Sequence, residues 1–139
     1  MSPAEEPIVE PQSESGPVIL VAEDEVMIRL GISEHLRSAG YTVIEAVNGQ
    51  EARAVLEAGV GVDLVFSDID MPMLDGIGLA QWILLNQPHT PVMLTSGLAA
   101  ALATAQTACP HVKAFVNKPY VYEAVADSMR AILARSARR

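Results

Sequence analysis

The chain has 139 residues, half of them hydrophobic, which is enough for one packed domain and leaves little room for a second. Its formal net charge of −8 excludes a general affinity for nucleic-acid phosphates, which requires clustered Lys and Arg side chains. A single cysteine, the lack of an apolar run of about 18 residues and the lack of a secretory signal lead us to expect a cytoplasmic protein without disulfides or a membrane segment.

The two ends of the chain differ in composition from the part between them. Residues 1–16, MSPAEEPIVEPQSESG, contain three prolines, four glutamates and few apolar side chains, so they cannot bury enough surface to offset the entropy of ordering them. We predict a disordered tail there, with an interaction segment as the alternative, and a folded domain over residues 17–136. Residues 137–139 form a short C-terminal end, and three basic side chains suit the negative end of a helix dipole there: Arg135, Arg138 and Arg139.

Five short apolar runs rich in β-branched residues recur along the domain. They are VILVA (18–22), TVIEA (42–46), VDLVFS (62–67), PVMLTS (91–96) and AFV (114–116). Most of these runs lack the polar alternation of a strand that has one face in water. Their composition is typical of strands in a parallel sheet covered on both faces.

Amphipathic segments separate these runs. In the first segment, the residues expected to face the core recur with helical spacing: Ile28, Gly31, Ile32, His35, Leu36 and Ala39. We expect four polar residues on its other sides: Glu25, Arg29, Ser33 and Arg37. The later segments repeat this spacing, at Ala52, Val55, Leu56 and Gly59, at Leu79 and Ile83, and at Val121, Val125, Met129 and Ile132.

Glycines and short polar residues mark the ends of these helices. Gly40 and Gly59 stand where C-terminal caps are expected, and Asn48 and Asp75 stand where N-terminal caps are expected. Five strands that alternate with five helices predict an α/β domain with right-handed crossovers. We predict a doubly wound (βα)5 domain whose five-stranded parallel sheet has the order 2-1-3-4-5, with a binding site beyond the carboxyl ends of strands 1 and 3.

Polar side chains gather at the predicted carboxyl ends of the strands: Glu23, Asp24, Asp68, Thr95 and Lys118. In the predicted fold these ends meet at one edge of the sheet. Carboxylates held together repel one another unless a cation lies between them, and a few carboxylates with water suit Mg²⁺. A lysine and a hydroxyl beside such a metal suit phosphoryl transfer, and aspartate is a nucleophile that forms an acyl phosphate.

Four motifs at these positions resemble the receiver domains of two-component response regulators. They are VAEDE (21–25), DIDMPMLDG (68–76), TSG (95–97) and NKP (117–119), in this order. Each motif alone is common, but all four in order, each at a predicted strand end, form a specific signature. The resemblance covers roughly residues 17–136 and implies the flavodoxin-like fold of receiver domains.

Carried over residue by residue, the resemblance implies a phosphorylation site and a switch. Asp68 would be the phosphoacceptor, Lys118 would pair with the phosphate, and Thr95 would hydrogen-bond a phosphoryl oxygen. Phosphorylation would draw the Thr95 hydroxyl inward, and Phe115 would turn into the space behind it as the switch aromatic. The face formed by the fourth helix, fifth strand and fifth helix would then change and bind a partner. The alternative is that Phe115 is simply a core residue of the fifth strand.

The resemblance also implies Mg²⁺ as the cofactor. Asp24 would bind the ion directly and Glu23 through water. Asp68 would also be a ligand, and Asp70 would offer its backbone carbonyl. For the side chain of Asp70, participation in the site and exposure to solvent are equally good readings.

The partners implied by the resemblance are a sensor histidine kinase or a histidine phosphotransfer protein, and a protein target. The chain would be a signalling phosphoacceptor that assists its own phosphorylation and dephosphorylation, not an enzyme in the usual sense. We expect no nucleic acid or membrane partner, and a monomer or weak homodimer. A free-standing regulator, a phosphate sink and a receiver from a hybrid kinase all remain open.

The predicted third helix offers a second surface for a target. Its segment QWILLNQ (81–87) has more apolar residues than one buried face needs, and an exposed apolar patch can mark a partner site. A target near Trp82 is therefore one interpretation. The other is that Trp82 folds over the edge of the domain.

Rival functions fit these motifs less well. The segment Asp68-Ile69-Asp70 is similar to the DxD of haloacid-dehalogenase-like phosphatases, but there the motif lies on the first strand and a hydroxyl or small residue follows. A calcium loop fails because Pro72 occupies a ligand position. A binding-only pseudo-receiver usually lacks one or more pocket residues, and this chain keeps them all.

The remaining metal-binding or redox-active residue types favour structural roles. His35 is expected to pack at the edge of the core, and His89 and His111 lie in loops beside prolines without the spacing of metal ligands. Cys109 is expected to be a small packing residue and Asp63 a strand-entry residue.

Overall fold

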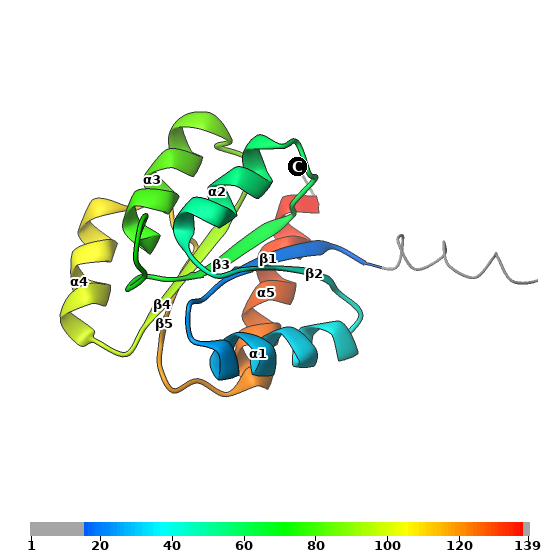
Figure 1. The fold of residues 1–139 in the computed structure, drawn as a ribbon. Coiled ribbons are helices and arrows are strands. Elements are labelled where there is room, and N and C mark those ends of the chain that lie inside the picture. The colour runs from blue at the N-terminus through cyan, green and yellow to red at the C-terminus, as the bar shows by residue number, and fades with distance from the viewer. Residues whose placement is uncertain (1–15, 138–139) are drawn as a thin grey trace, which may run out of the picture.

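The structure, a computed structural model, describes residues 16–137 (Figure 1). Within this range five strands are present: β1 (Val18–Ala22), β2 (Thr42–Ala46), β3 (Leu64–Asp68), β4 (Val92–Ser96) and β5 (Ala114–Asn117). Five helices alternate with them: α1 (Val26–Ser38), α2 (Gly49–Glu57), α3 (Gly76–Asn86), α4 (Ala99–Ala108) and α5 (Tyr122–Ala137). The tail predicted for residues 1–16 lies outside the described residues except for Gly16, and so do the last two arginines. None of the described helices is both long enough and apolar enough to cross a membrane.

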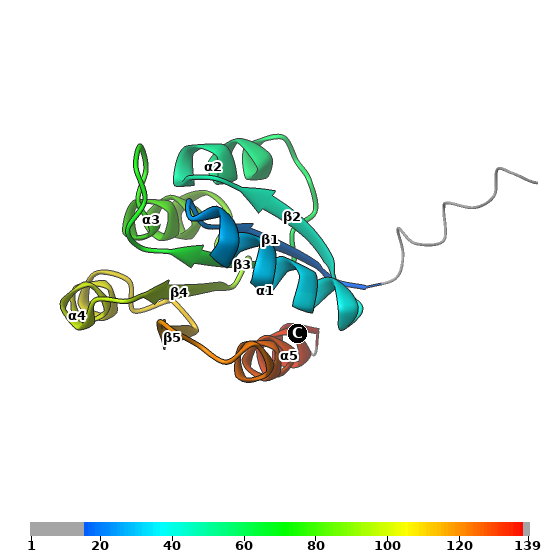
Figure 2. The ribbon, with the colours of Figure 1, turned by 60° about the horizontal axis from the view of Figure 1, so that its bottom comes forward.

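The five strands form one parallel sheet in the order β2-β1-β3-β4-β5, as predicted. Helices α1 and α5 cover one face, and α2, α3 and α4 cover the other (Figure 2). Since successive side chains of a strand point to opposite faces, each strand contributes to both layers. In β1, Ile19 and Val21 pack toward α1 and α5, whereas Leu20 and Ala22 pack toward the other helices. This double coverage explains the continuous apolar runs in the sequence.

The predicted element limits agree with the structure, and so do the caps. Every strand begins and ends within two residues of its predicted limits. The side chain of Asn48 accepts a hydrogen bond from the backbone N–H of Glu51 at 2.8 Å, and Asp75 caps α3 in the same way. Gly40 and Gly59 follow the last residues of α1 and α2 with φ of 103° and 83°, a conformation that glycine adopts at low cost.

Four residues of the predicted helix pattern lie elsewhere than expected: Ser33, Ala39, Gly59 and Val121. Ala39 and Gly59, predicted on the core side, lie beyond the last residues of α1 and α2 and are exposed. Ser33, predicted on a polar side of α1, is fully buried, so the buried stripe of this helix is wider than its apolar residues indicate. Val121, predicted on the core side of the last helix, precedes α5 and is exposed. The prediction was wrong there because residues 118–121 form the loop between β5 and α5, and the helix begins only at Tyr122.

Met73, in the loop between β3 and α3, has a left-handed backbone conformation with φ of 72° and an exposed side chain. This conformation costs a residue with a Cβ about 1–2 kcal/mol, whereas the extra freedom of glycine in the unfolded chain costs about 0.5–1 kcal/mol. Met73→Gly is therefore expected to raise the free energy of unfolding in urea by about 0.5–1 kcal/mol. The control Met27→Gly, at an exposed position inside α1, is expected to lower it by about 1 kcal/mol. Equal losses in both variants would contradict the argument.

Candidate phosphorylation site

The predicted site residues lie together at the carboxyl edge of the sheet. Glu23 and Asp24 follow β1, and Asp68 is the last residue of β3, the strand next to β1. Thr95 on β4 is the register partner of Asp68. Lys118 follows β5, and its backbone N–H donates to the carbonyl of Ser96 at 2.9 Å. Segments almost a hundred residues apart therefore meet because parallel strands end at the same edge.

Three carboxylates form the centre of the site. Glu23, Asp24 and Asp68 each place one oxygen so that all three lie within 4.8 Å of one another. Glu23 and Asp68 are buried, while Asp24 is exposed. The Nζ atom of Lys118 lies 2.9 Å from Glu23 Oε1 and 3.3 Å from Asp68 Oδ2, so one ammonium group joins the two buried acids.

The environment of Asp68 changes its acidity. Burial raises the pKa of the Asp68 carboxyl from 3.8 to about 6, and the charges of Glu23 and Asp70 act in the same direction. The charge and hydrogen bond of Lys118 oppose this increase. Burial alone lowers the pKa of Lys118, but its carboxylate partners outweigh burial and the pKa of Lys118 is raised. At neutral pH the site therefore holds an ionised aspartate beside an ammonium group.

The donor set fits a hard divalent cation. When Glu23, Asp24 and Asp68 are ionised, Lys118 neutralises only one of their three charges. The remaining negative charge is costly between buried side chains, and a divalent ion compensates it. Oxygen donors with one exposed member, Asp24, suit Mg²⁺, which keeps several waters when it binds to proteins.

Backbone and side-chain contacts hold Glu23 in place. One of its carboxylate oxygens accepts a hydrogen bond from the backbone N–H of Glu25 at 3.1 Å. The guanidinium of Arg29 donates to the carbonyl oxygen of Glu23 at 2.9 Å and also pairs with Glu45 at 3.1 Å. Arg29, expected only as a polar residue of the first helix, thus fixes the loop that carries the acidic pair. The sequence offered no signal for these contacts of Arg29, because Glu23 follows β1 whereas Glu45 lies on β2.

Thr95 and Phe115 lie on neighbouring strands beside Asp68. The hydroxyl of Thr95 donates to the backbone carbonyl of Val116 at 2.8 Å, so it is directed toward β5 and not toward Asp68. Phe115 on β5 is half-buried and packs against the core layer formed with α2, α3 and α4. Phe115 is the register partner of Leu94 and the chain neighbour of Val116, and Thr95 holds a hydrogen bond that it must give up to reach a group on Asp68.

Ser96 and Asp70 form a contact that the sequence reasoning missed. The Ser96 hydroxyl donates to Asp70 Oδ2 at 2.8 Å and accepts a hydrogen bond from the backbone N–H of Leu98 at 3.0 Å. The side chain of Asp70 is exposed but not free, because this bond joins it to the end of β4. Asp70 lies outside the three-carboxylate cluster. In the sequence, the only sign of this contact was a second hydroxyl residue, Ser96, directly after Thr95.

The other candidates occupy structural positions. His35 lies 3.1 Å from Glu123 and beside the ring of Tyr122, and His111 lies 2.9 Å from the carbonyl of Ala80. No histidine belongs to a cluster of three metal ligands among residues 16–137. Cys109 is buried, and burial raises the pKa of its thiol, which disfavours the reactive thiolate.

Trp82 is packed against the domain, which agrees with the interpretation that it folds over the edge. Its ring is half-buried against the core layer formed with α2, α3 and α4, and the guanidinium of Arg53 lies over it, 5.1 Å from the ring centroid. The exposed apolar side chains of α3 are its neighbours Leu84 and Leu85.

Comparisons with known proteins agree with this geometry. The receiver domain of the hybrid histidine kinase CckA is 32% identical, with a TM-score of 0.69 over 84% of this chain and 98% of that chain. The response regulator TrrA from Thermotoga maritima, in complex with Mg²⁺-BeF, is 27% identical, with a TM-score of 0.74 over 83% of this chain and 97% of that chain.

Two curated relatives are much longer than the matching region. Sensor kinase CckA of Brucella abortus is 33% identical over 116 residues, which cover 83% of this chain and 12% of that protein. The transcriptional regulatory protein PdtaR of Mycobacterium tuberculosis is 42% identical over 79 residues, which cover 56% of this chain and 38% of that protein. The family described as response regulator receiver domain matches residues 19–130. The chain therefore belongs to the response regulator receiver domain family of two-component signalling.

Proposed function

We propose that the chain accepts a phosphoryl group on Asp68 from a sensor histidine kinase or a histidine phosphotransfer protein. The observation that supports this most directly is the position of Asp68, a buried carboxylate with a raised pKa that contacts Lys118 and lies beside Glu23 and Asp24. A receiver domain is a signalling phosphoacceptor, and we propose that this one assists its own phosphorylation and dephosphorylation.

The chemistry follows from the ionised Asp68. A carboxylate oxygen attacks the phosphorus of a phosphohistidine, the P–N bond breaks, and its electron pair stays on the imidazole nitrogen, which takes up a proton. The product is an acyl phosphate on Asp68. Lys118, already 3.3 Å from Asp68 Oδ2, supplies fixed positive charge to the transferred group.

Mg²⁺ is the proposed cofactor. The residues that would hold it are Glu23, Asp24 and Asp68, with the backbone carbonyl of Asp70 as a further ligand. When bound, the ion would neutralise negative charge on the carboxylates and on the phosphoryl oxygens. Its role is supported by the uncompensated charge of the three acids and by the Mg²⁺-BeF complex of TrrA.

Thr95 and Phe115 are the proposed switch. To reach a phosphoryl oxygen, the Thr95 hydroxyl must leave the carbonyl of Val116. Phe115, the half-buried neighbour of Val116 on β5, would then turn inward. The face formed by α4, β5 and α5 would then bind a protein target. The exposed Leu84 and Leu85 near Trp82 are the second candidate surface for a target.

The side of the site formed by α1 and the loop before α5 suits the approach of a phosphodonor. A shallow pocket of about 440 Å³ lies beside Lys118 and is lined mainly by apolar and aromatic side chains: Met27, Ile28, Pro119, Tyr120 and Tyr122. Exposed apolar surface next to a reactive group is a suitable contact for a protein partner. This surface supports docking of the donor there.

The test is chemical labelling of the purified chain with Mg²⁺ and a small phosphodonor such as acetyl phosphate. The wild type is expected to gain one acid-stable, hydroxylamine-sensitive phosphoryl group that peptide mapping places on Asp68, and Asp68→Asn is expected to gain none. The control Asp127→Asn removes an exposed carboxylate on α5 that pairs with Arg130, and it should label like the wild type. A label that persists in Asp68→Asn, or a wild type that never labels, would exclude the proposed function.

A further inference from the structure

Two basic side chains have no acidic partner within the part of the chain that the structure describes. Among the Lys and Arg residues of the described range 16–137, all but Lys113 and Arg135 form an ion pair. The pairs are Arg29 and Arg37 with Glu45, Arg53 with Glu57, Arg130 with Asp127, and Lys118 with Glu23 and Asp68. In a chain with a net charge of −8, cations without partners are unexpected.

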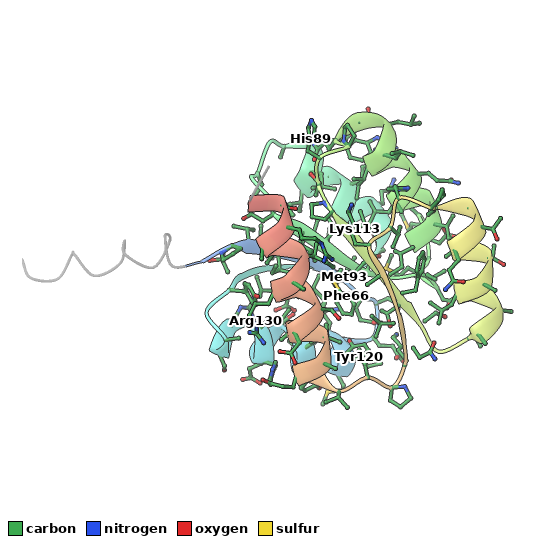
Figure 3. The ribbon with its side chains drawn as sticks, turned by 180° about the vertical axis from the view of Figure 1, so that it is seen from behind. Phe66, His89, Met93, Lys113, Tyr120 and Arg130 are labelled. Carbon is green, nitrogen blue, oxygen red and sulfur yellow. The ribbon has the colours of Figure 1, made fainter. Side chains whose placement is uncertain are left out.

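Both unpaired cations line the same pocket. This pocket, of about 620 Å³, lies between the α3–β4 loop, the α4–β5 loop and the C-terminal end of α5. His89 and His111 also line it, and its lining contains no Asp or Glu. Figure 3 shows Lys113 and His89 on the side of the molecule where α5 ends. Because β4 and β5 begin there, the pocket lies at the edge of the sheet opposite Asp68.

The two cations of this basic pocket are exposed, and only one of them has a local explanation. The Nε2 atom of His111 faces the carbonyl of Ala80 at 2.9 Å and therefore donates. In a neutral ring the buried Nδ1 atom is then an acceptor, so His111 lines the pocket but does not bind a carboxylate through this atom. Arg135 has a local explanation, because a cation in the last turn of α5 interacts favourably with the helix dipole. Lys113 precedes a strand, and the dipole does not account for it.

The N-terminal part of the chain begins its path next to this pocket. Pro17, just before β1, lines a small neighbouring pocket with Asp63, Leu133 and Ser136, and Ser136 also lines the basic pocket. The residues before Gly16 contain four glutamates and no Lys or Arg. Glu14 is three residues from Pro17, a span of up to about 10 Å in extended chain, and the whole segment can reach about 50 Å.

We propose that the basic pocket is a carboxylate-binding site and that its occupant is the acidic segment 1–15 of the same molecule. Glutamates of this segment pair with Lys113 and Arg135, which gives the two unpaired cations their partners. The covalent connection keeps these carboxylates at a high effective concentration, so weak individual ion pairs are sufficient. The site is separate from the phosphorylation chemistry and does not depend on it.

A spin label tests the proposal in the full chain. The label is attached to Ser2→Cys, at the end of the segment far from Pro17, and mass spectrometry verifies that the buried Cys109 stays unmodified. We expect paramagnetic broadening of the backbone amide signals of residues 111–113 and 135–136. This broadening should disappear in the Lys113→Gln, Arg135→Gln double variant and in about 1 M NaCl, where the Debye length falls to about 3 Å.

The matched control is Arg130→Gln, which removes an exposed cation of α5 that is already paired with Asp127. It should keep the broadening, whereas equal loss in this control would indicate a response to net charge and overturn the proposal. Broadening that is absent, or that survives in the double variant, would also overturn it. So would broadening that appears only between spin-labelled and isotope-labelled molecules in a mixture, because the occupant would then be a second copy. Unchanged amide shifts away from the pocket verify that the double variant is folded.

Discussion

Asp68→Asn is expected to raise the free energy of unfolding of the metal-free protein at pH 8 by roughly 2–3 kcal/mol. The reason is the pKa of Asp68, which is about 6 in the folded chain against an ordinary value of 3.8. Ionising this carboxyl is therefore harder in the folded than in the unfolded state. Asparagine keeps the shape of the side chain and removes the charge that burial and Glu23 disfavour.

The pH dependence of this difference has a definite sign. Below about pH 4, Asp68 is protonated in both states and the two proteins differ little through this group. Between pH 4 and 6 the folded wild type binds more protons than the unfolded chain, so this group lowers its stability as the pH rises. Above the folded pKa of about 6 the penalty is complete and constant. Urea denaturation of both proteins at pH 4 and pH 8 measures this difference in the free energy of unfolding.

Two further measurements sharpen this prediction. Saturating Mg²⁺ should stabilise the wild type more than Asp68→Asn at pH 8 and so reduce the difference, because the wild type offers one more carboxylate to the ion. Asp127→Asn, on the exposed side of α5, should change the stability by no more than about 0.5 kcal/mol. An Asp68→Asn protein that is less stable than the wild type at pH 8 without metal would contradict the argument.

Gly76→Ala is expected to lower the free energy of unfolding by about 3 kcal/mol. Gly76 begins α3, and its backbone N–H donates to the carbonyl of Ile69 at 2.9 Å. A Cβ atom there would lie 2.4 Å from the backbone oxygen of Asp68 and 2.8 Å from the Cα of Ile69. These are backbone atoms of Asp68 and its neighbour Ile69, so they cannot move aside without displacing Asp68.

A matched control exists in the loop before β3. Gly61 has no positive φ, and a Cβ added there would meet no atom within 4 Å. Gly61→Ala should therefore be neutral or slightly stabilising in the same denaturation experiment. Similar stabilities for the two variants would show that the loop after Asp68 adapts freely. The steric argument would then fail.

The fold was predictable from sequence because one physical pattern repeats five times. Buried parallel strands need apolar side chains on both faces, and the helices between them need one apolar side, so the two kinds of segment differ in composition. The prediction fails at single residues, where burial or a helix end does not follow this pattern. Ser33 is buried although its residue type favours a polar surface, and Val121 is exposed because it precedes α5.

The candidate site was predictable for the same reason. The carboxylates and the lysine follow or end strands, and the sheet order alone brings Glu23, Asp68 and Lys118 together. Contacts between loops were not predictable. The bond from Ser96 to Asp70 and the contact of Arg29 with the Glu23 carbonyl depend on side-chain positions that no periodicity encodes. Which basic residues form ion pairs was not predictable either, because it depends on where the acidic side chains lie in the fold.

The hydroxyl oxygen of Ser96 serves two neighbours at once, since it donates to Asp70 and accepts from the N–H of Leu98, the residue before α4. If Asp70 shifts by more than the tolerance of one hydrogen bond, it must either pull Ser96 along or lose it. As long as the bond holds, the first turn of α4 experiences the change through a single atom. A rearrangement at the rim of the carboxylate cluster is therefore mechanically coupled to the beginning of a helix more than twenty residues later in the chain.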